Sequence, residues 1–188
     1  MILPIYVYGW PLLRRKSEDI TPDYPNLQQL VADMFETMYN ADGVGLAAPQ
    51  IGLSIRLIVI DGTAMAKDDH PEDLLNGFKK TLVNPVIKAR GGDAWADNEG
   101  CLSLPKVREM VKRPQWIDID YFDEYFQPHS EHYDGVPARI IQHEYDHLEG
   151  SLFIDKISPL RRKLIAGKLT AISKGKVESN YKIKIFKK

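Results

Sequence analysis

The chain of 188 residues is 44% hydrophobic and 27% charged, close to the average of globular domains and long enough for one sizeable core. No apolar run approaches the roughly 20 residues needed to cross a bilayer, and residues 1–8 lack the pattern of a secretory signal, so we expect no membrane association. A single cysteine, Cys101, excludes an internal disulfide and agrees with a reducing compartment. We expect a cytoplasmic monomer folded as a single domain over residues 1–188.

Charge is divided unevenly along the chain, although the formal net charge is only −1. Residues 161–188, a basic C-terminal helix and tail, hold ten of the 25 Lys and Arg side chains but one of the 26 acidic ones. A basic segment on an acidic body can dock electrostatically to nucleic acid or to a ribonucleoprotein. The alternative, which we favour on the sequence alone, is a solvated helix with a frayed end.

The first predicted elements are a short strand and a helix. Residues 2–8 are apolar and β-prone, and they end in a turn at 9–11. Apolar side chains then recur at helical spacing between 27 and 38, with Asn26 as the expected N-cap. Residues 42–43 stop this helix.

Strands dominate the middle of the chain, and helices flank them. Strand-like runs lie at 56–61, 81–83, 86–89 and 116–122. A polar surface excursion at 64–78 and a loop at 125–135 connect them. Ser158 and Pro159 suit the start of a last helix that ends near Ile172, and 181–186 is either a short strand or a mobile end. The predicted class is therefore α+β.

The stretch QHEYDHLEG at 142–150 carries the strongest chemical signal. His143 and His147 are four residues apart, so a helix places both imidazoles on one face, where they can bind one metal ion. Glu144 beside them is the acid/base of the HExxH pattern. Two His on a helix are also compatible with a polar face or a satisfied core position, so a third ligand has to decide.

Cys101, in the stretch EGCLSLP at 99–105, is the candidate third ligand. Two His and one Cys leave a fourth coordination position for water, which is the composition of a catalytic site and not of a closed structural one. His129 and His132 compete for the same role, although their polar surroundings favour solvent exposure.

The stretch GVGLAAPQIG at 43–52 is the third unusual segment. Its first two glycines allow close approach of the backbone to a ligand, and Gln50 carries both donor and acceptor groups. In isolation the segment is more typical of a tight structural turn, and it lacks the lysine of a phosphate-binding loop.

Together and in this order, the three stretches resemble the motifs of the peptide deformylase family, and the resemblance spans residues 43–150. It implies a compact α+β domain in which antiparallel strands pack around the central HExxH helix, with helices towards both ends. It also implies that Cys101, His143 and His147 are the metal ligands and that Glu144 is the acid/base.

The same resemblance assigns the groups around the metal. The amide of Gln50 and the backbone N–H of Leu102 would stabilise a developing oxyanion. Five residues match positions that line the substrate cleft or its methionine pocket: Gly43, Val44, Gly45, Arg108 and Ile140. Trp10 and the long 64–78 excursion depart from the family pattern outside the three motifs, so they bear on the rim of the site more than on its chemistry.

The implied activity is that of a metal-dependent hydrolase, a peptide deformylase, that removes the N-formyl group from the formylmethionine of newly made polypeptides and releases formate. Its partners would be nascent formylmethionyl polypeptides in a bacterial cytoplasm, with ribosome docking through the basic segment 161–188. A Cys/His₂ donor set favours Zn²⁺ or Fe²⁺ without separating them. The family implies Fe²⁺ in the cell, with Zn²⁺, Ni²⁺ or Co²⁺ in a purified sample.

Two other interpretations stay open at this point. A zinc endopeptidase with the same helix motif takes a remote His or Glu as its third ligand, and Glu149 is too close to His147 for that. A metal-stabilised module that docks to nucleic acid through its basic tail would have a closed fourth coordination position and no role for Glu144.

Overall fold

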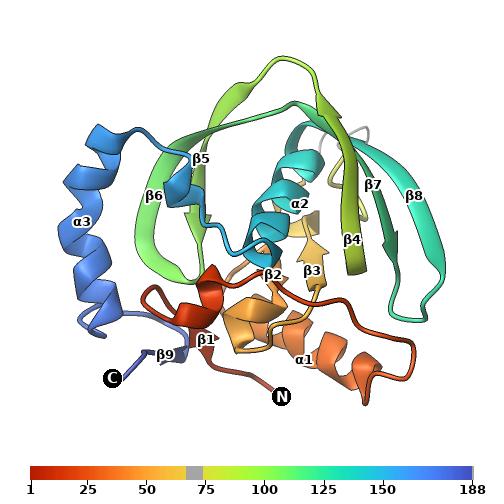
Figure 1. Cartoon of the computed structure of the whole chain (residues 1–188), viewed down its shortest axis with the longest axis horizontal. Helices are drawn as coiled ribbons and strands as arrows, with labels where there is room; N and C mark the ends of the chain where they lie inside the picture. Colours follow the sequence, from red (N-terminus) through yellow and green to blue (C-terminus); the bar gives the residue numbers. More distant parts are fainter. Residues whose placement is uncertain (67–73, 188) are drawn as a thin grey trace.

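The computed structural model describes residues 1–66 and 74–187, so the middle of the predicted excursion, 67–73, lies outside the described residues. Five strands form the main sheet: β2 (Gly45–Ala47), β3 (Leu57–Asp61), β4 (Lys79–Gly91), β7 (Trp116–Phe122) and β8 (Pro128–Asp134). They lie in the order β2-β3-β4-β7-β8, and all neighbours are antiparallel (Figure 1).

Three α-helices accompany the sheet: α1 (Leu27–Asn40), α2 (Gly135–Leu148) and α3 (Pro159–Ser173). Short 3₁₀ turns lie at Pro11–Arg14, Ala48–Ile51, Thr63–Met65 and Phe153–Asp155. None of the described helices has the length and apolarity needed to cross a membrane. The helix α2 carries the HExxH pattern, and eleven of its 14 residues are buried.

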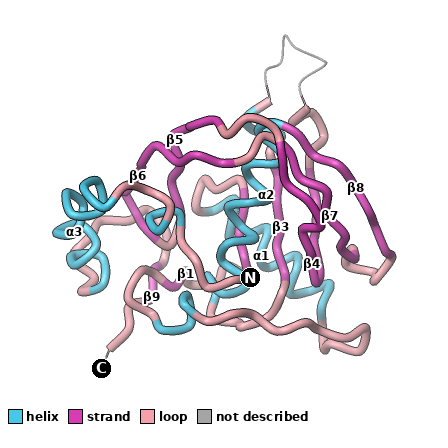
Figure 2. Tube along the Cα trace, turned by 45° about the horizontal axis from the view of Figure 1, so that its top comes forward, coloured by secondary structure: helices cyan, strands magenta, loops and turns pink. Residues whose placement is uncertain are grey.

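A hairpin of two strands, β5 (Trp95–Cys101) and β6 (Leu104–Arg113), forms a separate small sheet. Figures 1 and 2 show α2 in the middle of the molecule, with this hairpin on one side and β4, β7 and β8 on the other. The predicted α+β class, with antiparallel strands around a central helix and further helices towards both ends, is confirmed.

Buried apolar side chains form three clusters. One joins α1 to β2 and β3, a second joins α2 to the main sheet, and a third joins β6 to α3. Because the second cluster fixes one face of α2 against the sheet, the opposite face, with the two His, is presented to the β5–β6 hairpin.

The prediction of two separate strands at 81–83 and 86–89 was wrong, because both segments belong to the single strand β4. Asn84 has a φ of +50°, and its side-chain amide bonds both backbone groups of Ile20, at 2.9 and 2.7 Å. The register shifts between Val83 and Val86, so the Asn84–Pro85 pair forms a bulge within one strand and does not end it.

The strand β8 shows that the prediction of a loop at 125–135 was wrong over most of its length. Its residues are mainly polar, and the partner strand β7 compensates for this with cross-strand pairs. His132 Nδ1 lies 2.7 Å from Asp118 Oδ1, and Ser130 donates to Asp120 at 2.7 Å. These pairs depend on a partner strand, so local propensity does not reveal them.

The predicted capping of α1 needs correction. Asn26 precedes α1 as expected, but it has a φ of +55° and makes no capping bond with its side chain. The helix α2 begins at Gly135. The start of α3 is as predicted, because Ser158 Oγ accepts a hydrogen bond from the Arg161 N–H at 3.3 Å.

The two ends of the chain meet. The strand β1 (Ile5–Tyr6) pairs in parallel with β9 (Ile183–Lys184), and Figure 1 shows both beneath the β5–β6 hairpin. Of the two predictions for residues 181–186, the short strand is confirmed.

Candidate metal centre

The three predicted ligands converge between the end of β5 and one face of α2. The Sγ of Cys101 and one ring nitrogen each of His143 and His147 all lie within 4.8 Å of one another. The Cys101 Sγ is 3.3 Å from His147 Nε2. A tetrahedral ion at the usual bond lengths, about 2.3 Å to sulfur and about 2.1 Å to nitrogen, would separate such a pair by about 3.6 Å. The donor set therefore fits a four-coordinate divalent metal with small adjustments.

His129 and His132 do not belong to this cluster. Both lie on β8, where His129 Nε2 is 3.0 Å from Asp123 and His132 Nδ1 is 2.7 Å from Asp118. Within residues 1–66 and 74–187, Cys101, His143 and His147 are the one group of three metal-binding side chains that converges. The alternative third ligands are therefore excluded by their position.

The electrostatics of the cluster also favour a cation. Burial acts to lower the pKa of His143, but its hydrogen bonds to Cys101 and Glu99 raise it to about 10. Burial lowers the pKa of His147 well below its usual value, so this imidazole is neutral, the form that binds metals. The raised pKa of His143 shows that the groups around it favour a positive charge, and a bound metal ion would be stabilised by the same groups.

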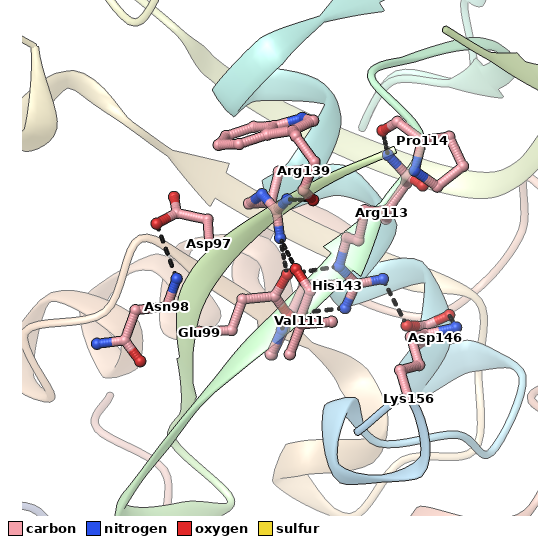
Figure 3. A network of polar contacts seen from close by, with 12 residues as sticks. Asp97, Asn98, Glu99, Val111, Arg113, Pro114, Arg139, His143, Asp146 and Lys156 are labelled. Atoms are coloured by element: carbon pink, nitrogen blue, oxygen red, sulfur yellow. Dashed lines mark hydrogen bonds and ion pairs between the residues drawn. The ribbon is translucent and has the colours of Figure 1, made fainter. Parts of the chain in front are cut away.

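Glu99 orients one of the two histidines. Its Oε2 lies 2.9 Å from His143 Nδ1 (Figure 3), so Nε2 is the ring nitrogen that is left to bind a metal. Arg113 donates to both carboxylate oxygens of Glu99, at 2.6 and 2.8 Å, and Arg139 donates to Oε1 at 2.6 Å. Burial acts to raise the pKa of Glu99, but the bonds from Arg113 and His143 hold it well below its usual range. The carboxylate is therefore ionised and held in one position.

The network continues along α2. Arg113 also donates to Asp146 at 2.8 Å, and Lys156 lies 3.2 Å from the same carboxylate (Figure 3). Sequence reasoning missed the roles of Arg113 and Arg139. One signal was present: β6 alternates buried and exposed residues, and Arg113 falls on the buried side of this alternation, where an arginine needs a partner.

Glu144 is buried beside the cluster on α2. A side chain at Gly45 would collide with its carboxylate, so the glycine leaves the room that Glu144 occupies. Its Oε2 makes no hydrogen bond to the residues that the structure describes. Burial raises the pKa of Glu144 to about 7. A buried carboxylate with an unused oxygen suits proton transfer better than a structural bond.

Gln50 presents a donor to the same place. Its Oε1 accepts a hydrogen bond from the Ala47 N–H at 2.8 Å, which fixes the orientation of the amide. The Nε2 then donates to Ser103 Oγ at 3.2 Å and to Cys101 Sγ at 3.5 Å. The segment 43–52 is thus more than a tight turn, because it delivers an oriented N–H to the cluster.

A cavity of about 450 Å³ opens on these groups. All predicted site residues except His147 contribute to its wall: Gly43, Val44, Gly45, Gln50, Cys101, Leu102, Arg108, Ile140, His143 and Glu144. His147 lies behind them, almost fully buried. Arg108 donates to the Asn98 carbonyl at 3.3 Å on the exposed side. Tyr181, from the C-terminal segment, also lines the cavity and was not among the predicted residues.

Comparisons with known proteins agree with this geometry. The family model of polypeptide deformylases matches residues 2–163. The peptide deformylase of Flavobacterium johnsoniae is 54% identical over 98% of this chain and 96% of that protein, and the one of Christiangramia forsetii is 50% identical over the same shares. The crystal structure of a peptide deformylase from Legionella pneumophila has a TM-score of 0.80 at 36% identity and covers 94% of this chain and 98% of that one. The chain therefore belongs to the polypeptide deformylase family, whose members are enzymes.

Proposed function

We propose that the chain is a metal-dependent amide hydrolase that removes the formyl group from N-formylmethionine at the start of nascent polypeptides and releases formate. The proposal includes residues 1–188 as one catalytic domain. The observation that carries it is the placement of three groups around one cavity: the donor cluster, the buried Glu144 carboxylate, whose Oε2 has no partner among the described residues, and the amide of Gln50.

We assign the metal to Cys101, His143 and His147. A divalent ion held there would act as a Lewis acid on the formyl carbonyl and lower the pKa of water to near neutrality. We expect Fe²⁺ in the cell, and Zn²⁺, Ni²⁺ or Co²⁺ in a purified sample, because thiolate and imidazole suit all four ions. Elemental analysis of protein purified without added metal tests this assignment.

The proposed reaction needs a proton acceptor and later a proton donor. Glu144 takes a proton from the attacking water and returns it to the amine nitrogen that leaves, so one carboxyl serves both steps. Its burial supports this role, since a carboxyl with a raised pKa can gain and lose a proton near neutral pH. Such positioned acid–base help typically contributes about 10²–10⁴-fold to the rate.

The tetrahedral intermediate carries a negative oxygen, for which we propose two donors. The Nε2 of Gln50 is already oriented by the Ala47 N–H, and the backbone N–H of Leu102 follows the metal ligand Cys101 directly. Because both are fixed before the substrate arrives, little reorganisation is needed when the charge develops. One such donor is typically worth about 10²–10³-fold in kcat.

Substrate choice follows from the rest of the wall. Val44 and Ile140 supply apolar surface for an unbranched methionine side chain, and Gly43 and Gly45 let the peptide backbone approach. A site for a free amino terminus would need an available acid. Glu99, in the same wall, is engaged by two arginines and a histidine, so this carboxylate is not available to bind an α-ammonium group.

The test is formate release under anaerobic conditions. Protein loaded with Fe²⁺ is incubated with formyl-Met-Ala, with Met-Ala and with an internal peptide that lacks a formyl group. Formate is expected from the first substrate alone, and cleavage of the internal peptide would favour an endopeptidase. No formate from formyl-Met-Ala, with the metal shown to be bound, would falsify the proposal.

A docking role for the basic segment is a second proposal. On α3, Arg161 is bound to Glu109 at 2.9 Å and Arg162 lies 3.2 Å from Asp155, so both serve the body of the protein. Lys163 and Lys168 are exposed and form no ion pair with the described residues. We propose that these lysines contribute to contact with ribosomal RNA, as suits an enzyme acting on nascent chains.

A further inference from the structure

The C-terminal segment returns to the catalytic cavity. After α3 the chain runs back to form β9, which pairs with β1, and Tyr181, two residues before β9, lines the cavity. The family model ends at residue 163, so this part of the wall lies beyond the matched region. No motif in residues 43–150 could assign it a role.

Tyr181 makes a specific contact there. Its hydroxyl donates a hydrogen bond to the backbone carbonyl of Leu102 at 2.8 Å. Leu102 and Ser103 form the two-residue turn between β5 and β6, directly after Cys101. Burial raises the pKa of Tyr181 to about 12, so its hydroxyl keeps its proton at neutral pH.

The other polar groups of this turn are held from elsewhere in the chain. The Ser103 carbonyl accepts a hydrogen bond from the Tyr8 N–H at 2.9 Å, and Ser103 Oγ accepts one from Gln50 at 3.2 Å. Among the described residues, the Leu102 carbonyl accepts its hydrogen bond from Tyr181. Half-buried backbone carbonyls need a partner to hold one orientation, so Tyr8 and Tyr181 fix two different peptide planes of the turn.

The segment around Tyr181 is anchored on both sides. Asn180 donates to Asp42 at 3.3 Å, next to Gly43 of the cavity wall, and Glu178 pairs with Lys106 at 2.9 Å. Tyr181 and Leu102 both pack against the apolar cluster between α1 and the sheet. These contacts fix the position of the Tyr181 hydroxyl next to the Leu102 carbonyl.

We propose that Tyr181 is a positioning residue for the deformylase reaction, an inference that rests on the proposed function. By fixing the Leu102 carbonyl, its hydroxyl limits rotation about the Cα of Leu102 and holds the N–H of the same residue toward the developing oxyanion. The ring closes the cavity wall beside Leu102 and Gly43. The C-terminal segment therefore contributes to the active site by positioning the turn that follows Cys101.

The hydroxyl and the ring are tested by two variants and a matched control. Tyr181→Phe removes the hydroxyl alone, and Tyr181→Leu also removes the ring. The control is Tyr6→Phe, because the Tyr6 hydroxyl accepts a hydrogen bond from Lys184 at 3.0 Å on the same pair of strands and does not line the cavity.

For Tyr181→Phe, kcat on formyl-Met-Ala should fall about 3- to 10-fold with KM within about twofold, as expected from one neutral hydrogen bond. Tyr181→Leu should also raise KM. Tyr6→Phe should leave both constants unchanged and lower the Tm by a similar amount to Tyr181→Phe. Amide hydrogen exchange at residues 102 and 103 should be faster in Tyr181→Phe alone.

Two results would overturn the inference: a kcat for Tyr181→Phe equal to that of Tyr6→Phe, or unchanged exchange at residues 102 and 103. The exchange measurement needs no substrate. If the unmodified enzyme releases no formate, the proposed function fails, and exchange still decides whether Tyr181 holds the turn.

Discussion

The Glu99 carboxylate lies 2.9 Å from Nδ1 of His143, and two arginines hold it there. A carboxylate bound to one ring nitrogen makes that nitrogen the donor, so the other nitrogen presents its lone pair. Glu99 is two residues before Cys101 in sequence, and β5 therefore provides one proposed ligand and orients another. The hairpin and α2 are thus coupled at the centre of the site.

Replacement of Glu99 should loosen the metal. In Glu99→Gln, Arg113 keeps only Asp146 as a charged partner and His143 loses a strong acceptor, so metal affinity should fall about 10- to 100-fold. Competition with a chelator of known affinity measures the change. Glu109→Gln is the matched control, because Glu109 lies opposite Glu99 in the hairpin, is also buried and is bound by Arg161.

The control should lose stability without losing metal affinity. Equal affinities in Glu99→Gln and the unmodified protein would show that His143 needs no help from Glu99. Equal losses in both variants would mean that damage to the hairpin, and not the contact to His143, weakens the site.

Removal of the Glu144 carboxyl should separate metal binding from turnover. Glu144→Ala should keep the metal, since no ligand is lost, and kcat should fall about 10²–10⁴-fold. Metal content is measured by elemental analysis and kcat by formate release. Turnover close to that of the unmodified enzyme would remove Glu144 from the mechanism.

Exchange of the cysteine should act on the metal first. In Cys101→Ser a hard oxygen replaces a thiolate, so the affinity for Zn²⁺ or Fe²⁺ should fall at least 10-fold. His129→Gln serves as the control, because His129 is bound to Asp123 away from the cluster. Unchanged metal content in Cys101→Ser at limiting metal would argue against the proposed ligand set.

Docking through α3 is best tested by reversing the charge of exposed lysines and not by deleting the C-terminal segment. Loss of residues 174–188 would also remove β9 and Tyr181, and Tyr181 lines the cavity. The double variant Lys163→Glu and Lys168→Glu should reduce ribosome co-sedimentation most strongly at low salt and leave turnover on a short peptide unchanged.

The control for this experiment changes the same net charge elsewhere. Lys16 and Lys88 are exposed and lie outside α3, and each makes one exposed ion pair, with Glu149 at 3.5 Å and with Asp120 at 3.6 Å. Lys16→Glu with Lys88→Glu therefore matches the change in net charge. If both double variants co-sediment as the unmodified protein does, the basic helix is a solvated surface. A loss in both would indicate a general effect of net charge.

Local rules explain which elements the sequence predicts. The histidines of α2 share a face because of the four-residue spacing, and Ser158 caps α3 because a serine oxygen can accept from the first turn. The strand β8 and the bulge at Asn84 depend instead on Asp118 of β7 and on Ile20. Those partners are remote in sequence, and only pairing brings them together.

By itself the sequence determined the chemistry available to this protein: a thiol, two imidazoles at helical spacing, a neighbouring carboxyl and three glycine-marked motifs. The tertiary structure decided which groups support them. Glu99 meets His143 across 44 residues of chain, and Tyr181 meets Leu102 across 79. Such contacts depend on how the hairpin, α2 and the C-terminal strand pack together, because residues so far apart in the chain are brought into contact by the fold and not by local spacing.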